Sequence, residues 1–214
     1  MEPTTGPWAE KRRLAAAMRR VIGELVVTDA PEADLRAAAD ALKGFAESLA
    51  GHPKRSRLEG FAETAVAGDV EAFFDQSPLV GLSNPLAPPI TLKAEGKRVS
   101  AKVVFGAAYE GPPGHVHGGF IAAAFDDVLG FAQSVTGQPG MTAQLSVGYR
   151  LPTPLHTPLL FKAGVDRVSG RKTFASGSLM AGEKVTAEAE ALFISVDRER
   201  FAAFIEAAKV GGGS

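Results

Sequence analysis

The sequence predicts an α+β fold, in which helices at the amino end and a long helix in mid-chain precede an antiparallel run of strands. Two observations support this class. Apolar residues recur at helical spacing between residues 8 and 50 and again between 118 and 134. After residue 140 the apolar spacing changes to every second residue, in four successive stretches separated by turn-forming residues.

The amino-acid composition limits the kinds of function to be expected. The 214 residues are 45% apolar and 22% charged, as in globular proteins with a sizeable core, and the net charge of −1 gives no reason to expect nucleic acid as a partner. The absence of cysteine excludes disulfides and thiolate chemistry. No apolar run approaches the ~20 residues that span a bilayer, and no secretory signal pattern opens the chain. We therefore expect a soluble, cytoplasmic protein without membrane insertion.

The amino-terminal part is predicted to be helical, over residues 8–27 and 31–50 and in a shorter helix over 69–75. The second helix carries apolar residues at helical spacing: Leu35, Ala38, Ala39, Leu42, Phe45, Ala46 and Leu49. We expect four regions: a helical extension (1–76), a proline-rich linker (77–89), the main domain (90–197), and a short helix with a flexible tail (198–214). The extension is expected to pack on the main domain or cap its ligand site, and a partner-binding role stays open.

Strands are predicted on both sides of the central helix. Val99, Ala101, Val103 and Phe105 alternate with polar residues, which predicts one or two strands before the helix. Four strands are predicted after it, over 141–151, 158–168, 172–181 and 184–196. Ser169-Gly170 and Ala181-Gly182 stand where hairpin turns are needed.

The central helix is apolar around most of its circumference, which is typical of a helix buried inside a domain. Its remaining arc holds Ala123, Asp126, Asp127 and Gly130. A carboxylate buried there has to be paired, hydrated or functional, although both aspartates are equally compatible with an exposed face. Gly118 and Gly119 open this helix, and their backbone N–H groups are suited to bind a phosphate or an oxyanion.

Three features together resemble one family. They are the loop Gly111-Pro112-Pro113-Gly114, the sequence His117-Gly118-Gly119 with Asp126 nine residues after His117, and the strand sequence over 141–154. The chain resembles the PaaI-like hotdog thioesterases, of the thioesterase superfamily, over residues 90–197. The resemblance implies a hotdog fold, in which an antiparallel sheet wraps a long helix and protomers join edge to edge as a homodimer or homotetramer.

The resemblance also implies hydrolysis of acyl-CoA thioesters, without a cofactor. Asp126 matches the catalytic carboxylate, as general base or as nucleophile, and Asp127 matches no catalytic position. Thr142 matches the hydroxyl residue beside the carboxylate, and the Gly118 N–H matches the oxyanion donor. His117 is expected to anchor the loop.

We expect Gly119, His115, Phe120 and Arg150 to contact the substrate, and Phe125 to line an acyl pocket with Phe120. His115 and His117 form a His-x-His pair, but they flank a turn, so a metal site is not predicted. Where many relatives carry an amide side chain before His-Gly-Gly, this sequence has Gly111.

Gly118 and Asp126 are eight residues apart on one helix, hence ~12 Å along its axis. They cannot act on one carbonyl within a single chain, so the active site is predicted to combine two chains. Two alternatives to hydrolysis stay open: a non-catalytic hotdog protein that binds acyl-CoA or acyl carrier protein, and a hotdog dehydratase.

Overall fold

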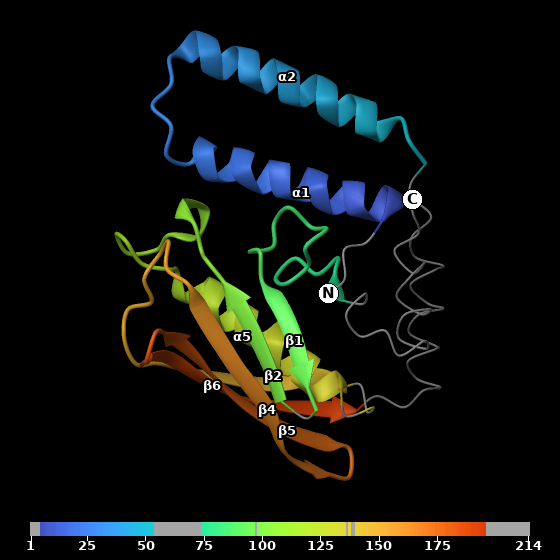
Figure 1. Ribbon diagram of the computed structural model, residues 1–214, viewed down its shortest axis with the longest axis vertical. Helices are drawn as coiled ribbons and strands as arrows, with labels where there is room; N and C mark the ends of the chain where they lie inside the picture. Colours follow the sequence, from blue (N-terminus) through green and yellow to red (C-terminus); the bar gives the residue numbers. More distant parts are fainter. Residues whose placement is uncertain (1–4, 54–73, 97, 136, 138–139, 196–214) are drawn as a thin grey trace.

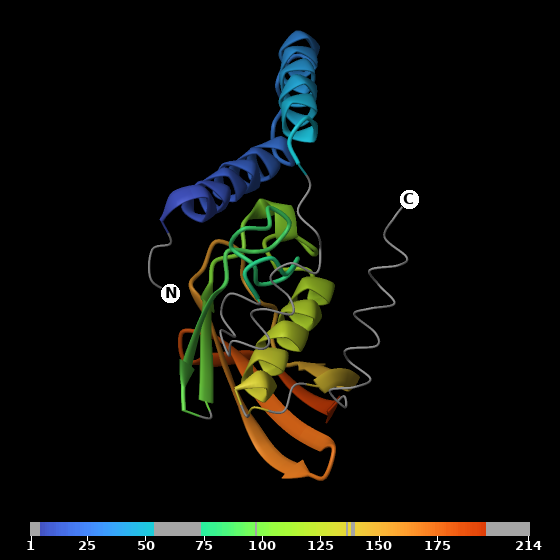
Figure 2. The ribbon, with the colours of Figure 1, turned by 90° about the vertical axis from the view of Figure 1, so that its right-hand side faces the viewer.

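The computed structural model describes residues 5–53, 74–96, 98–135, 137 and 140–195. Six strands form one antiparallel sheet in the order β1-β2-β4-β5-β6-β3, and the long helix α5 (Gly118–Ser134) lies across one face of it. Figures 1 and 2 show this sheet curving around α5. An antiparallel sheet wrapped around one long helix is the hotdog fold, so the predicted fold class is confirmed.

The strands follow the alternation of the sequence. Their bounds are β1 Thr91–Glu95, β2 Arg98–Val103, β3 Gly140–Tyr149, β4 Leu159–Ser169, β5 Lys172–Ala181 and β6 Lys184–Ser195. The strand expected from alternation around residue 100 is β2, in which Val99, Ala101 and Val103 are buried. The alternation did not single out β1, because Leu92 is its one buried residue.

The core lies between α5 and the concave face of the sheet. One set of α5 residues faces the sheet and is buried: Ile121, Ala124, Phe125, Val128, Leu129, Phe131 and Ala132. Phe125 meets Phe161 of β4 edge to face, with ring centroids 5.0 Å apart. Burial of each large apolar side chain contributes about 1.5–3 kcal/mol, so this face holds α5 firmly in place.

Strand β3 is an edge strand, and its apolar side is only partly covered. β6 pairs with one side of β3, and no strand of the described chain pairs with its other side. Leu145 and Val147 touch the core, whereas Met141 and Tyr149 are 50% and 53% exposed. The alternation over 141–151 therefore predicted the strand correctly but not its burial, which in an edge strand depends on what lies beyond the edge.

The two amino-terminal helices, α1 (Gly6–Leu25) and α2 (Glu32–Ala50), lie beyond one end of the sheet (Figures 1 and 2). Arg19 of α1 donates to the backbone carbonyls of Leu82 and Asn84, at 3.0 and 2.8 Å. No residue of α2 is buried. The helix predicted over 197–209, and nearly all of that predicted over 69–75, lie outside the described residues. Within the described part, no helix is long and apolar enough to cross a membrane.

An ion pair joins α1 to Asp75, two residues before the proline-rich segment begins. Arg12 donates from Nη2 and Nε to Oδ1 of Asp75, at 2.8 and 2.9 Å. The Asp75 side chain has no exposed surface, and its Oδ2 has no hydrogen-bond partner among the described residues. The Asp75 carboxylate therefore depends on Arg12 for compensation of its charge.

We expect Arg12→Ala to lower the free energy of unfolding by about 3 kcal/mol, because it leaves a buried carboxylate without its cation. The adjacent Arg13 is the matched control, since it pairs only with Glu10 and both side chains are well exposed. Exposed pairs of this kind contribute little. Chemical denaturation of both variants checks the prediction, and equal destabilisation by the two would contradict it.

Candidate active site

The loop that precedes α5 is fixed by its own backbone. The Gly111 N–H donates to the His115 carbonyl, and the His117 N–H donates to the Tyr109 carbonyl, both at 2.9 Å. The loop is also bound to the segment after β3, because the Val116 N–H donates to the Thr153 carbonyl at 2.9 Å. The start of α5 is thus held in one place from both sides.

The same packing explains the glycine at position 111. A Cβ atom on Gly111 would lie 2.7 Å from the Cα of His117, which is too close for any side chain. An amide at this position, as many relatives carry, would require the loop to move. At this position the loop therefore offers backbone groups and no side chain.

The first turn of α5 presents one N–H group without an acceptor. His117 caps the helix, and its Nδ1 accepts from the Gly119 N–H at 3.0 Å. The Phe120 N–H donates to the His117 carbonyl at 3.0 Å. The Gly118 N–H has no hydrogen-bond partner among the described residues. Of the two glycines that open the helix, Gly118 is therefore the one whose N–H is free to meet a ligand.

Tyr149, at the end of β3, lies against Gly118. Its hydroxyl donates to the Gly118 carbonyl at 2.7 Å. A Cβ atom on Gly118 would lie 3.2 Å from the Tyr149 ring. Sequence reasoning missed Tyr149 as a site residue and assigned it only to the strand alternation, since nothing in the sequence indicates that the end of β3 meets the start of α5.

The two adjacent aspartates of α5 have different surroundings. Thr142 of β3 donates from its hydroxyl to Oδ1 of Asp126 at 2.8 Å. The register of β3 shifts between Thr142 and Gln144, and such a bulge re-aims the side chains beside it. Asp126 is half-buried and Thr142 is exposed, so this carboxylate faces the open edge of the sheet.

Asp127 faces inward instead. The Ser77 hydroxyl, from the proline-rich segment, donates to its Oδ2. Burial raises the pKa of the Asp127 carboxyl to about 6, the hydrogen bond from Ser77 opposes that rise, and the negative charge of Asp126 adds to it. Asp127 thus joins α5 to the proline-rich segment and lies away from the open edge.

This raised pKa predicts that the protein is most stable in mild acid. The folded state holds the proton on Asp127 more tightly than the unfolded state does, so stability falls as the pH rises from about 4 to about 6. The difference from the ordinary pKa of 3.8 corresponds to about 3 kcal/mol at neutral pH. Asp127→Asn should remove this part of the pH dependence, which melting curves across that range would measure. An unchanged slope in the variant would contradict the assignment.

The remaining predicted site residues are less close to one another. Nδ1 of His115 lies 2.8 Å from the Pro113 carbonyl within the loop. Arg150 pairs with Glu188 of β6 at 2.7 Å, so its guanidinium is already engaged. Phe120 is half-buried and meets Tyr109 edge to face at 5.0 Å. Phe125 is fully buried, so the expectation that it lines an acyl pocket is wrong: its ring packs on Phe161.

Gly130, on the remaining arc of α5, lies near β6, since a Cβ atom there would lie 3.8 Å from the ring of Phe193. No group of three or more His, Asp or Glu residues in the described part of the chain could hold a metal ion.

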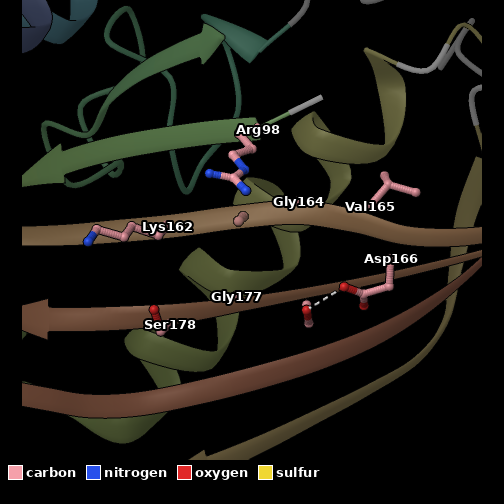
Figure 3. A pocket seen from close by; sticks show the side chains of 9 residues that line it. Arg98, Lys162, Gly164, Val165, Asp166, Gly177 and Ser178 are labelled. Carbon is pink, nitrogen blue, oxygen red and sulfur yellow. Dashed lines mark hydrogen bonds between the residues drawn. The ribbon is translucent and has the colours of Figure 1, made fainter. Parts of the chain in front are cut away.

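A separate hollow lies on the outer face of the sheet, where Figure 3 shows Arg98 above Gly164 and Lys162 to the left on the same strand as Gly164. Ser176 donates to Asp166 beside it at 2.8 Å. In Figure 3 α5 runs behind the sheet, on its opposite face. This hollow is therefore separate from Asp126 and the start of α5.

Comparisons with known proteins find similarity to thioesterases. The thioesterase superfamily profile matches residues 113–188. Acyl-coenzyme A thioesterase THEM4 of Bos taurus is 37% identical over 93 residues, which are 42% of this chain and 38% of the relative. The protein of the same name from Rattus norvegicus is 34% identical over 110 residues, 50% of this chain and 47% of the relative. The chain thus spans less than half the length of these relatives.

Solved structures extend the likeness to nearly the whole chain. The crystal structure of a thioesterase superfamily protein is 34% identical, with a TM-score of 0.79, and the match covers 91% of this chain and 94% of that one. Zebra fish thioesterase superfamily member 2 shares the fold at 18% identity and a TM-score of 0.51, over 57% of this chain and 94% of that one. On the strength of the first match, which spans nearly the whole of both chains, this chain belongs to the thioesterase superfamily.

Proposed function

We propose that this protein hydrolyses acyl-CoA thioesters to a free acid and CoA, in a site shared by two chains. The observation that carries the proposal is the pairing of Asp126 with Thr142 at the open edge of the sheet, at 2.8 Å. The hydroxyl binds one carboxylate oxygen, and the other has no hydrogen-bond partner among the described residues, so it is available to a substrate or to water. The THEM4 relatives, at 34–37% identity, are named acyl-coenzyme A thioesterases.

In the proposed reaction the substrate carbonyl accepts a hydrogen bond from the Gly118 N–H. Asp126 removes a proton from water, the hydroxide attacks the carbonyl carbon, and the carbon–sulfur bond breaks as the thiolate takes up the proton. In the alternative route Asp126 attacks the carbonyl carbon, the carbon–sulfur bond breaks to release CoA as the thiolate, and water then hydrolyses the mixed anhydride to the free acid and the Asp126 carboxylate. Both routes place negative charge on the carbonyl oxygen, where the positive end of α5 stabilises it.

Two chains are needed because one α5 holds the two groups too far apart. Gly118 and Asp126 are separated by ~12 Å along the helix axis. The unpaired edge of β3, with Met141 and Tyr149 exposed, supports edge-to-edge pairing with a second copy. In that dimer, the start of one α5 meets Asp126 of the other chain. We further propose residues 90–197 as the catalytic domain, and a cytoplasmic location that the cysteine-free sequence supports.

A panel of acyl-CoAs, from short aliphatic to long-chain and aromatic, tests this function through release of free thiol. Hydrolysis of at least one member is the expected result. Tight binding without release of thiol would instead support the non-catalytic acyl-CoA binding protein, against which Asp126 argues, because a pure binder has no use for a carboxylate facing the thioester.

A further inference from the structure

A groove of about 510 Å³ lies between α1 and the start of α5. Residues of α1 form one wall, Pro85, Leu86 and Pro89 of the proline-rich segment form a second, and Tyr109 and Phe120 lie at its inner end. A hollow of this size is within the range of ligand pockets. The sheet and α5 alone would not form the first wall, because α1 belongs to the amino-terminal extension.

The groove has an apolar surface that remains exposed. Leu86 is 65% exposed and Val104 44%, although both are large apolar side chains. The charged residues in its lining are Arg19 and Arg20, and the Arg19 guanidinium is held by the carbonyls of Leu82 and Asn84. Such an arginine offers its aliphatic stem to the groove. The lining is therefore suited to an apolar chain and presents no acidic side chain.

The inner end of the groove adjoins the proposed oxyanion donor. Phe120 lies on the same helical turn as Gly118, and its ring meets that of Tyr109 at 5.0 Å. The Tyr109 carbonyl in turn accepts from the His117 N–H at 2.9 Å. A carbonyl bound at the Gly118 N–H, one residue after His117, would thus lie near this inner end of the groove.

From this continuity we infer that the groove binds the acyl chain of the substrate, and that α1 sets the length of chain accepted. The inference rests on the proposed function and adds the substrate class: thioesters of apolar acyl groups much longer than acetyl. It also assigns a role to the extension, which covers the acyl site instead of serving only as a separate interaction module.

Gly23 offers a matched test. It lines the groove, and a Cβ atom there would meet nothing within 4 Å; the same holds for the Cβ of Gly44, on the exposed helix α2. Gly23→Phe should fill the groove and lower kcat/KM for long-chain acyl-CoA by about tenfold or more relative to short-chain acyl-CoA. Gly44→Phe should keep the wild-type profile. Identical chain-length profiles in the two variants would overturn the inference.

A second pair of variants tests the groove in case Gly23→Phe does not fold. Leu86→Ala shortens an exposed side chain in the groove, and Leu25→Ala shortens one outside it that is 59% exposed. Leu86→Ala should lower kcat/KM for long-chain acyl-CoA several-fold, and Leu25→Ala should leave it unchanged. Equal effects of the two substitutions would contradict the groove assignment.

Binding of a non-hydrolysable long-chain alkyl-CoA thioether separates this inference from the proposed function. Weaker binding in Gly23→Phe than in Gly44→Phe supports the groove, even if the wild-type protein hydrolyses no acyl-CoA. A wild-type protein that hydrolyses no acyl-CoA would overturn the proposed function alone. Equal binding by the two variants would overturn the groove assignment, whether or not the protein is a hydrolase.

Discussion

Asp126→Asn is expected to lower kcat for acyl-CoA hydrolysis by at least about a hundredfold, because an amide neither accepts the proton of water nor attacks a thioester. The substitution changes little else. The Thr142 hydroxyl that donates to Oδ1 of Asp126 at 2.8 Å can donate equally to the amide oxygen. The circular dichroism spectrum and the oligomeric state should therefore match those of the wild type.

Asp127→Asn is the matched control, since it makes the same chemical change one residue away. Asp127 is half-buried, and its carboxylate accepts from Ser77 of the proline-rich segment instead of from β3. We expect this variant to keep its activity and to gain stability at neutral pH. Near-normal turnover in Asp126→Asn, or equal loss in both variants, would contradict the assignment of Asp126 as the catalytic carboxylate.

Gly118→Pro is expected to lower kcat by about 10²–10³, the effect of removing one oxyanion donor. Proline removes the N–H and suits the first position of a helix. The preceding residue, His117, already has the extended conformation that proline requires (φ −61°, ψ 129°). Gly118→Ala is the control, because it crowds the Tyr149 ring in the same way but keeps the N–H. Equal loss in the two variants would mean that crowding, not the missing donor, is responsible.

The same variant tests whether the site combines two chains. A mixed dimer of an Asp126→Asn chain and a Gly118→Pro chain has one site with both groups intact. Random exchange of subunits should then restore about a quarter of the wild-type rate, since half of the dimers are mixed and one of two sites in each is intact. If exchange occurs without any gain in rate, the two groups do not act across a dimer.

Much of the fold was predictable because its helices and strands are indicated by the local spacing of apolar residues. The alternation of buried residues such as Val99 and Ala101 sets a strand, and the nearly all-apolar sequence of α5 sets a buried helix. β1 was not singled out, because a strand with Leu92 alone buried has no alternation to detect. The half-covered face of β3 was also missed, since burial of an edge strand is a property of the sheet order.

The candidate site was predictable only in part. The spacing of His117 and Asp126 was visible, but the periodicity left Asp126 and Asp127 equivalent, and only the family resemblance selected between them. The structure separates them by contact: Thr142 with one and Ser77 with the other, from segments far apart in the chain. Arg150 stays a predicted substrate contact, and the structure adds its ion pair with Glu188 of the neighbouring strand β6, which the sequence did not indicate.

The sequence by itself determined the strands, the helices and the glycine-led start of α5, because these depend on neighbours within a few residues. Tertiary structure alone decided which N–H is free, where Tyr149 lies and how α1 borders a groove. Those outcomes depend on pairs such as Arg12 with Asp75 and Tyr149 with Gly118. Residues so far apart in the chain come into contact only when the whole core has formed, so no local sequence pattern predicts these contacts.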